Sequence, residues 1–88
     1  MDGLETIINE LSLVAELFYQ ENLKNAYAGL VAALPKLEKE LQEIEDDDAR
    51  QEVTDKLNLT LQAMEDNDSI LIADTIQYEL IEALQQLI

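Results

Sequence analysis

Apolar residues recur along the chain at spacings of three and four rather than in the alternating order of a strand. Two glycines and one proline in 88 residues leave little turn chemistry for β-hairpins. Polar joints interrupt the pattern near residues 20–25, 43–50 and 65–68. The pattern predicts an all-α fold, with residues 1–88 forming a single domain that is an antiparallel bundle of three to four helices.

The first two predicted helices are separated by a short polar joint. The first covers residues 4–19, and Asp2 and Glu5 before and within it have the spacing of a capping box. The second begins after Asn22 as its N-cap and contains Pro35, which cannot donate to the carbonyl four residues back. The second helix is therefore expected to be kinked or split at Pro35, and the apolar phase continues across the proline, which favours the kink.

The third and fourth predicted helices begin at acidic caps. The run "EIEDDDAR" ends the second helix and offers Asp47 or Asp48 as the N-cap of the third. After the break "EDND", Asp68 can cap the first turn of a fourth helix that continues to Ile88.

Each predicted helix carries one apolar stripe for the core. In the first helix the stripe is Leu4, Ile7, Ile8, Leu11, Val14, Ala15 and Phe18, with Leu13 and Leu17 outside it. The second stripe is Leu23, Tyr27, Leu30, Val31, Leu34, Leu37, Leu41 and Ile44, and the third is Val53, Leu57, Leu61 and Met64. The fourth is Ile72, Ala73, Ile76, Leu80, Ala83, Leu84 and Leu87, with Ile70, Ile81 and Ile88 extending one edge.

The charge balance narrows the choice of partners. Twenty acidic residues oppose five basic ones, and the net charge of −15 disfavours nucleic acid and anionic membranes while favouring a basic partner. The absence of cysteine fits a reducing compartment, and neither a signal peptide nor an apolar run of about 18 residues is apparent, so we expect a cytoplasmic protein.

Little catalytic or cofactor chemistry is available. Without histidine or cysteine, no residue supplies a base for a hydroxyl nucleophile or a thiolate for a metal, and the acidic run that starts at Asp46 does not match a calcium-binding loop. We therefore expect no enzyme, no metal site and no cofactor. The triplet Asp68-Ser69-Ile70 resembles the modified serine site of acyl carrier proteins, which implies a prosthetic group on Ser69. In that family, however, the serine lies near the middle of the chain, usually after a glycine, whereas here only 19 residues follow it.

The fourth predicted helix also carries apolar residues outside its core stripe. Leu71 and Tyr78 are seven residues apart and therefore stack on one side, in a row that also contains Asp74 and Glu82. An apolar pair with an acidic border is typical of a binding surface for a basic, amphipathic segment. Two alternatives remain open: a neighbouring helix covers the pair, or the helix forms a homodimer.

The stretch "EDNDSILIADTIQYEL" resembles the C-terminal signature of an uncharacterised family of small acidic helical proteins from Gram-positive bacteria. The residues that match that signature are Ala73, Asp74, Tyr78, Glu79 and Leu80. Gln77 replaces a glutamate of the pattern, and Glu82 or Ala83 stands where a proline is expected. The resemblance implies that Asp74, Tyr78 and Glu79 are the characteristic residues of the family signature.

These observations predict a non-enzymatic protein-interaction module, an adaptor or chaperone-like protein. The predicted partner-binding residues are Leu71, Asp74, Tyr78, Glu79 and Glu82. The alternatives are an acyl- or peptidyl-carrier-type protein modified on Ser69 and an acidic mimic of nucleic acid.

The net charge of −15 also predicts how stability responds to salt. Repulsion among the carboxylates opposes folding, and at 0.1 M salt it is screened beyond about 10 Å. The melting temperature should therefore rise between low and moderate salt, as followed by circular dichroism. A melting temperature that does not change would contradict the self-repulsion argument.

Overall fold

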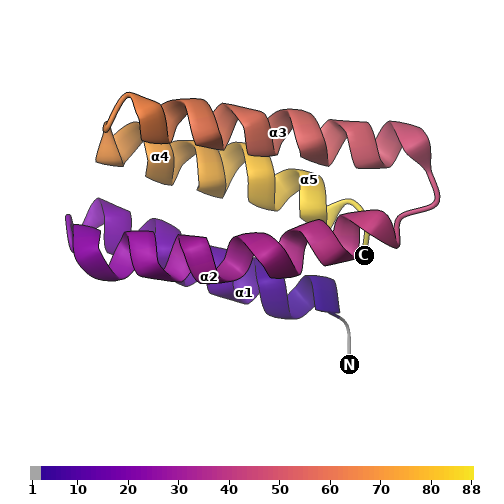
Figure 1. Ribbon diagram of the computed structural model, residues 1–88, viewed down its shortest axis with the longest axis horizontal. Helices are drawn as coiled ribbons and strands as arrows, with labels where there is room; N and C mark the ends of the chain where they lie inside the picture. The colour runs from indigo at the N-terminus through magenta and orange to yellow at the C-terminus, as the bar shows by residue number, and fades with distance from the viewer. Residues whose placement is uncertain (1–2) are drawn as a thin grey trace.

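The computed structural model describes residues 3–88, and all regular structure in that range is helical (Figure 1). The helices are α1 (Gly3–Tyr19), α2 (Leu23–Gln42), α3 (Asp47–Glu65), α4 (Ser69–Thr75), the π-helical turn η1 (Ile76–Leu80) and α5 (Ile81–Gln85). The last three segments follow one another without a break, and residues 69–85 are called the last helix below. The all-α prediction is confirmed, with four helices within the described residues.

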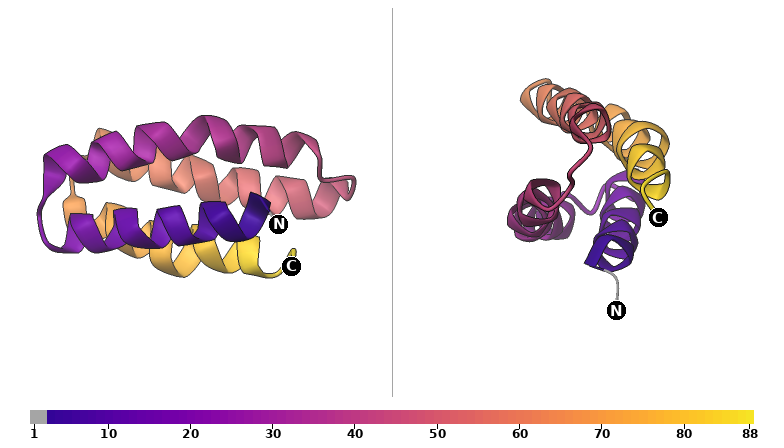
Figure 2. Two further views of the ribbon diagram at one scale, coloured as in Figure 1. Left: turned by 90° about the horizontal axis from the view of Figure 1, so that it is seen from below. Right: turned by 90° about the vertical axis from the view of Figure 1, so that its right-hand side faces the viewer.

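The four helices form two antiparallel hairpins, α1 with α2 and α3 with the last helix (Figure 1). The hairpins stack so that the last helix packs against both α1 and α3. The end-on view in Figure 2 shows the four helices around a common centre, with α2 and α3 on one side and α1 and the last helix on the other. The last helix therefore has helical neighbours on two sides, whereas α2 packs mainly against α1.

An aliphatic core fills the space between the helices, and the stripe predicted for α1 faces it. The buried residues of the other helices include Ala26, Leu30, Ala33, Leu37, Leu41, Val53, Leu57, Thr60, Ala63, Ile72, Ile76, Leu80, Ile81 and Leu84. Thr60 can be buried because its hydroxyl donates to the carbonyl of Lys56 at 3.0 Å.

Several residues of the predicted stripes are exposed instead. In α2, Val31 is 60% exposed and Leu23 is also exposed, because Ala26 and Ala33 take the core positions. In α3, Leu61 is 39% exposed, because Thr60 and not Leu61 faces the core. The prediction that Val31, Leu23 and Leu61 belong to the core stripes was therefore wrong.

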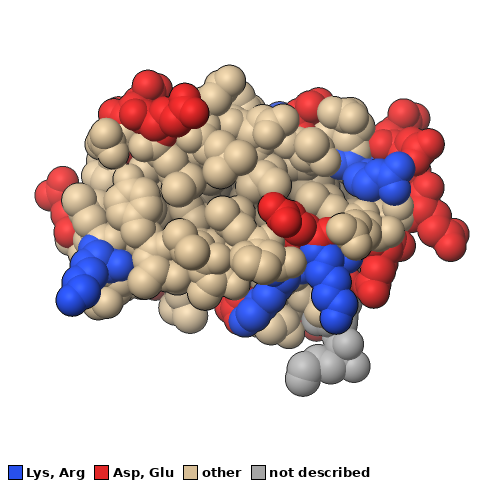
Figure 3. All heavy atoms as spheres, in the orientation of Figure 1, with Lys and Arg blue, Asp and Glu red and all other residues tan. Residues whose placement is uncertain are grey.

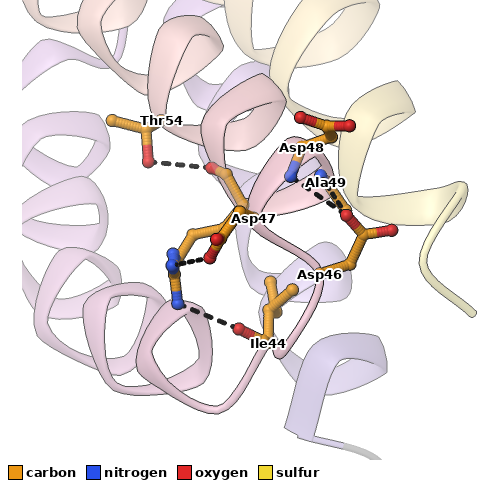
Figure 4. Close-up of polar contacts among 7 residues, drawn as sticks. Ile44, Asp46, Asp47, Asp48, Ala49 and Thr54 are labelled. Carbon is orange, nitrogen blue, oxygen red and sulfur yellow. Dashed lines mark hydrogen bonds and ion pairs between the residues drawn. The ribbon is translucent and has the colours of Figure 1, made fainter.

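The N-cap of α3 is Asp46, one residue before the predicted Asp47 or Asp48 (Figure 4). The Asp46 carboxylate accepts hydrogen bonds from the backbone N–H groups of Asp48 at 3.0 Å and Ala49 at 3.3 Å. Asp47 already belongs to the first turn and forms an ion pair with Arg50, whose guanidinium also donates to the Ile44 carbonyl at 3.1 Å. The prediction of Asp47 or Asp48 as the cap is corrected.

The predicted starts of the first and second helices agree with the structure only in part. Asn22 occupies the N-cap position of α2, although its side chain makes no capping hydrogen bond. Asp2, the first member of the predicted capping box, lies outside the described residues.

Pro35 lies inside a continuous α2, so the helix is not split. The carbonyl without a donor belongs to Val31, on an exposed side of the helix where water can take the place of the missing N–H.

The assignment of the α3 cap predicts a difference between two neighbouring aspartates. Asp46→Ala removes an acceptor of two backbone N–H groups and should lower the free energy of unfolding by about 1 kcal/mol. Asp48→Ala removes the same charge from the first turn without removing the cap, and should cost less. Urea denaturation of both variants measures the difference. Equal effects, or a larger loss from Asp48→Ala, would contradict the assignment.

Candidate interaction site on the last helix

The last helix contains one wider turn, which was not predicted from the sequence. The Ile81 N–H donates to the carbonyl of Ile76, five residues back, and this bond closes the π-helical turn η1. On an uninterrupted α-helix, Ile81 would point about 180° away from Ile72, since nine residues at about 100° each separate them. Both side chains are nevertheless buried, because the wider turn resets the helical phase.

The turn corrects two predictions about this helix. The fourth helix, which was predicted to run to Ile88, ends at Gln85 and contains the wider turn Ile76–Leu80. Ile81 lies in the core rather than on an edge, whereas Ile70 and Ile88 are exposed. The wider turn therefore lets the last helix bury apolar residues against two neighbours along its whole length.

Leu71 and Tyr78 lie on the side of the last helix that neither neighbour covers. Leu71 is 43% exposed and Tyr78 is 62% exposed. Tyr78 is also part of the π-helical turn, a feature that is frequent at functional sites. Of the two alternatives left open by the sequence, coverage by a neighbouring helix within the chain is excluded for the described residues.

Asp74 joins this surface to the end of α1. Its carboxylate accepts a hydrogen bond of 2.5 Å from the hydroxyl of Tyr19, the last residue of α1. The bond to Asp74, partial burial, the charge of Asp74 and the nearby Tyr78 together raise the pKa of Tyr19 from 10.0 to about 12. Tyr19, Leu71, Asp74 and Tyr78 are called the Tyr78 surface below.

Tyr19 was missed in the sequence reasoning. It lies 55 residues before Asp74, and only the antiparallel packing of α1 on the last helix brings the two side chains together. Its sole sequence signal is an aromatic residue at the end of a helix, next to the buried Phe18. A phenol there has an apolar ring for contact and a hydroxyl that finds an acceptor.

The two predicted glutamates differ in their surroundings. Glu79 is half-buried and forms an ion pair of 3.3 Å with Lys56 of α3, so it contributes to packing between helices. Glu82 is exposed, and helical spacing places it near Tyr78. The structure therefore brings Asp74 and Tyr78 close to Tyr19 and leaves Leu71 exposed on the same helix. Glu82 is exposed one turn after Tyr78, and Glu79 is turned towards α3.

Ser69 is the first residue of the last helix and is half-buried. The preceding Asp68 is the N-cap, as predicted, and its carboxylate accepts a hydrogen bond from the Leu71 N–H at 3.1 Å. Capping by Asp68 accounts for the Asp-Ser-Ile sequence without a modification. Among residues 3–88, no three acidic side chains are grouped so that they could hold a metal ion.

The fold and the Tyr78 surface define a small, strongly acidic four-helix domain with an exposed aromatic and acidic surface. In the described part of the chain, no helix has the length and apolar character needed to cross a membrane. The chain belongs to the family described as a domain of unknown function (DUF8042), which matches residues 1–88. Comparisons with curated proteins and with solved structures found no match.

The hydrogen bond between Tyr19 and Asp74 predicts the behaviour of the protein at high pH. Because the pKa of Tyr19 is raised in the folded state, the stabilisation from this bond is complete below about pH 10 and is lost as the pH rises towards 12. Titration of tyrosinate absorbance should therefore show a late step that is absent in Tyr19→Phe. Asp74→Asn should move that step to lower pH, and Tyr78→Phe should retain it. A late step that survives in Tyr19→Phe would contradict the assignment.

Proposed function

We propose that the protein is a non-enzymatic interaction module, an adaptor or chaperone-like protein, which binds a basic or amphipathic segment of another protein on the Tyr78 surface. The proposed setting is the cytoplasm of a Gram-positive bacterium. The observation that carries the proposal is the exposure of Leu71 and Tyr78 on a helix whose opposite side is fully packed.

The contacts of the last helix suggest why this surface suits a partner. Its core residues pack against α1 and α3, and Glu79 pairs with Lys56, so the backbone under Leu71 and Tyr78 is fixed. An aromatic ring on a fixed backbone loses little conformational entropy when a partner covers it. Leu71 provides an apolar floor beside the ring, and Tyr78 provides the aromatic anchor.

The charge around these residues indicates the chemistry of the segment. Asp74 accepts one hydrogen bond from Tyr19, and a carboxylate has capacity for further donors. Glu82 adds a second exposed carboxylate, and the whole chain has a net charge of −15. A segment with apolar residues flanked by lysine or arginine would place its cations against these acids and be attracted over long range.

The proposal is tested with the double variant Leu71→Ser/Tyr78→Ser. Tagged wild-type protein produced in its own host should retain a partner that native mass spectrometry identifies, and the double variant should lose it. Because both side chains are exposed, the variant should melt within a few degrees of wild type. Leu13→Ser is a matched control, since Leu13 is 62% exposed on α1, and it should retain the partner.

Two results would contradict the proposal. If the double variant melts many degrees lower, Leu71 and Tyr78 belong to the core. If the partner binds the double variant as well as wild type, another surface binds it. The dependence of partner affinity on salt distinguishes a contact anchored by Tyr78 from charge attraction alone. An acidic mimic of nucleic acid should lose nearly all affinity for its partner when salt is added, whereas a contact anchored by Tyr78 should lose less.

A further inference from the structure

A second apolar edge lies on α2, on the side away from α1. The side of α2 that faces α1 is identified by Gly29, where an added methyl group would come within 2.9 Å of a Val14 methyl, and by Lys36, which pairs with Glu10 at 2.8 Å. Helical spacing places a different set of residues on the opposite edge. This set, the α2 seam, is Lys24, Tyr27, Val31, Leu34 and Glu38.

The α2 seam has the spacing of a helix-pairing surface. Its members alternate at three and four residues, which is the repeat that presents one stripe of a helix to a second helix. Its centre is apolar: Val31 is 60% exposed, and Tyr27 and Leu34 are half-buried. Tyr27 and Leu34 are half-buried because they also pack against the core, where the Tyr27 ring lies edge-on to Phe18 with 5.0 Å between the ring centroids. Val31 is therefore the open position at the centre of the seam.

The charges at the two ends of the seam are opposite and equally distant from its centre. Lys24 lies seven residues before Val31 and Glu38 lies seven residues after it, about 10 Å away in each direction along the helix. Among residues 3–88, neither Lys24 nor Glu38 forms an ion pair, although acids outnumber bases by 20 to 5 in the chain. Within the described part of the chain, the Lys24 ammonium is therefore left without an acidic partner.

The face formed by α2 and α3 continues the apolar centre of the seam. Figure 3 shows this face, where uncharged side chains predominate along the middle and most charged groups lie towards the ends and edges. On α3, Leu61 is exposed and Met64 is half-buried. Helical spacing turns Leu61 away from Lys56, which marks the side of α3 facing the last helix, whereas Met64 also packs against the core.

We propose that the α2 seam binds a second copy of this chain, with the two α2 helices antiparallel and a twofold axis at Val31. In that arrangement Lys24 of each copy lies opposite Glu38 of the other, so both ion pairs form at once. Val31 meets its own counterpart at the axis, flanked by Tyr27 and Leu34. The interface is isologous and closed, which produces a dimer rather than a chain of subunits.

The charge pattern selects a second copy over an unrelated helix. A seam with a cation at one end, an anion at the other and an apolar centre is complementary to itself when it is turned end to end. All five basic residues lie on α2 and α3, so these two helices carry every positive side chain that can offset the repulsion between two chains that each carry −15. The surface is separate from the Tyr78 surface, which stays exposed in the dimer.

Charge reversal tests the proposal on the full chain. Sedimentation equilibrium in moderate salt should show a mass near twice 10.0 kDa for wild type. Lys24→Glu and Glu38→Lys each replace two attractive contacts by two repulsive ones and should each weaken the dimer by roughly tenfold or more. The double variant Lys24→Glu/Glu38→Lys restores opposite charges across the axis and should recover the dimer.

The Glu38→Lys variant distinguishes the effect of the specific ion pair on dimer affinity from the effect of general repulsion between the two chains. This variant changes the net charge from −15 to −13, because one negative charge is lost and one positive charge is gained. General repulsion between the chains would therefore decrease, and association without specific pairing would become stronger. The proposal requires the opposite result, a weaker dimer.

Val31→Glu provides a second test at the centre of the seam, because it places two carboxylates together at the axis. It should abolish the dimer, and Leu13→Glu, at a similarly exposed position on α1, should not. Circular dichroism checks that both variants are folded. A wild-type chain that stays at 10.0 kDa up to about 1 mM would overturn the proposal. A dimer that resists Val31→Glu, or is broken by Leu13→Glu or by Tyr78→Ser, would overturn it as well.

Discussion

The structure depends on the burial of the last helix between α1 and α3. This helix supplies Ile72, Ile76, Leu80 and Leu84 to the core and connects the two hairpins, since it packs against α1 of one and α3 of the other. Without it, α1 and α3 would expose their apolar faces to water. Burial against two neighbours requires a broad apolar face, and the π-helical turn broadens it by bringing Ile81 into the core.

The same constraint determines which surfaces remain open. Because the inner side of the last helix is occupied by packing, Leu71, Asp74 and Tyr78 are presented on its outer side, and Tyr19 is added from the end of α1. Because α2 has one main helical neighbour, its seam around Val31 is exposed on the opposite part of the molecule. A net charge of −15 keeps such apolar surfaces from associating at random, and the local charges favour particular partners.

Local periodicity was enough to predict the helices, and longer-range contacts account for most of what it missed. The four helices and the stripe of α1 follow from the spacing of apolar residues, which depends on neighbours within two turns. The cap at Asp46 could not be chosen among three consecutive aspartates, because each offers the same side chain to the first turn. Burial of Thr60 was missed because its hydroxyl is satisfied by the Lys56 carbonyl, which makes it acceptable in a core.

The candidate site could be predicted only in part, because periodicity describes one helix at a time and not how separate helices align. Periodicity placed Leu71, Asp74 and Tyr78 on one side of a helix, and all three are exposed in the structure. It could not predict the bond from Tyr19 or the ion pair between Glu79 and Lys56, because both depend on how separate helices align. The wider turn at Ile76–Leu80 has no comparable signal in the sequence.

The last helix is buried on one side and open at Leu71 and Tyr78 on the other. The chain has no cysteine, so single cysteines can be placed on each side and their reaction with a thiol reagent followed in the native protein. Leu71→Cys and Tyr78→Cys should react nearly as fast as the same variants in denaturant. Ala73→Cys, at a buried neighbouring position, should be slowed by roughly a thousandfold or more, since it reacts only after the helix opens. Comparable protection of Tyr78→Cys and Ala73→Cys would show that the outer side of the last helix is covered as well, and that the helix has no open side.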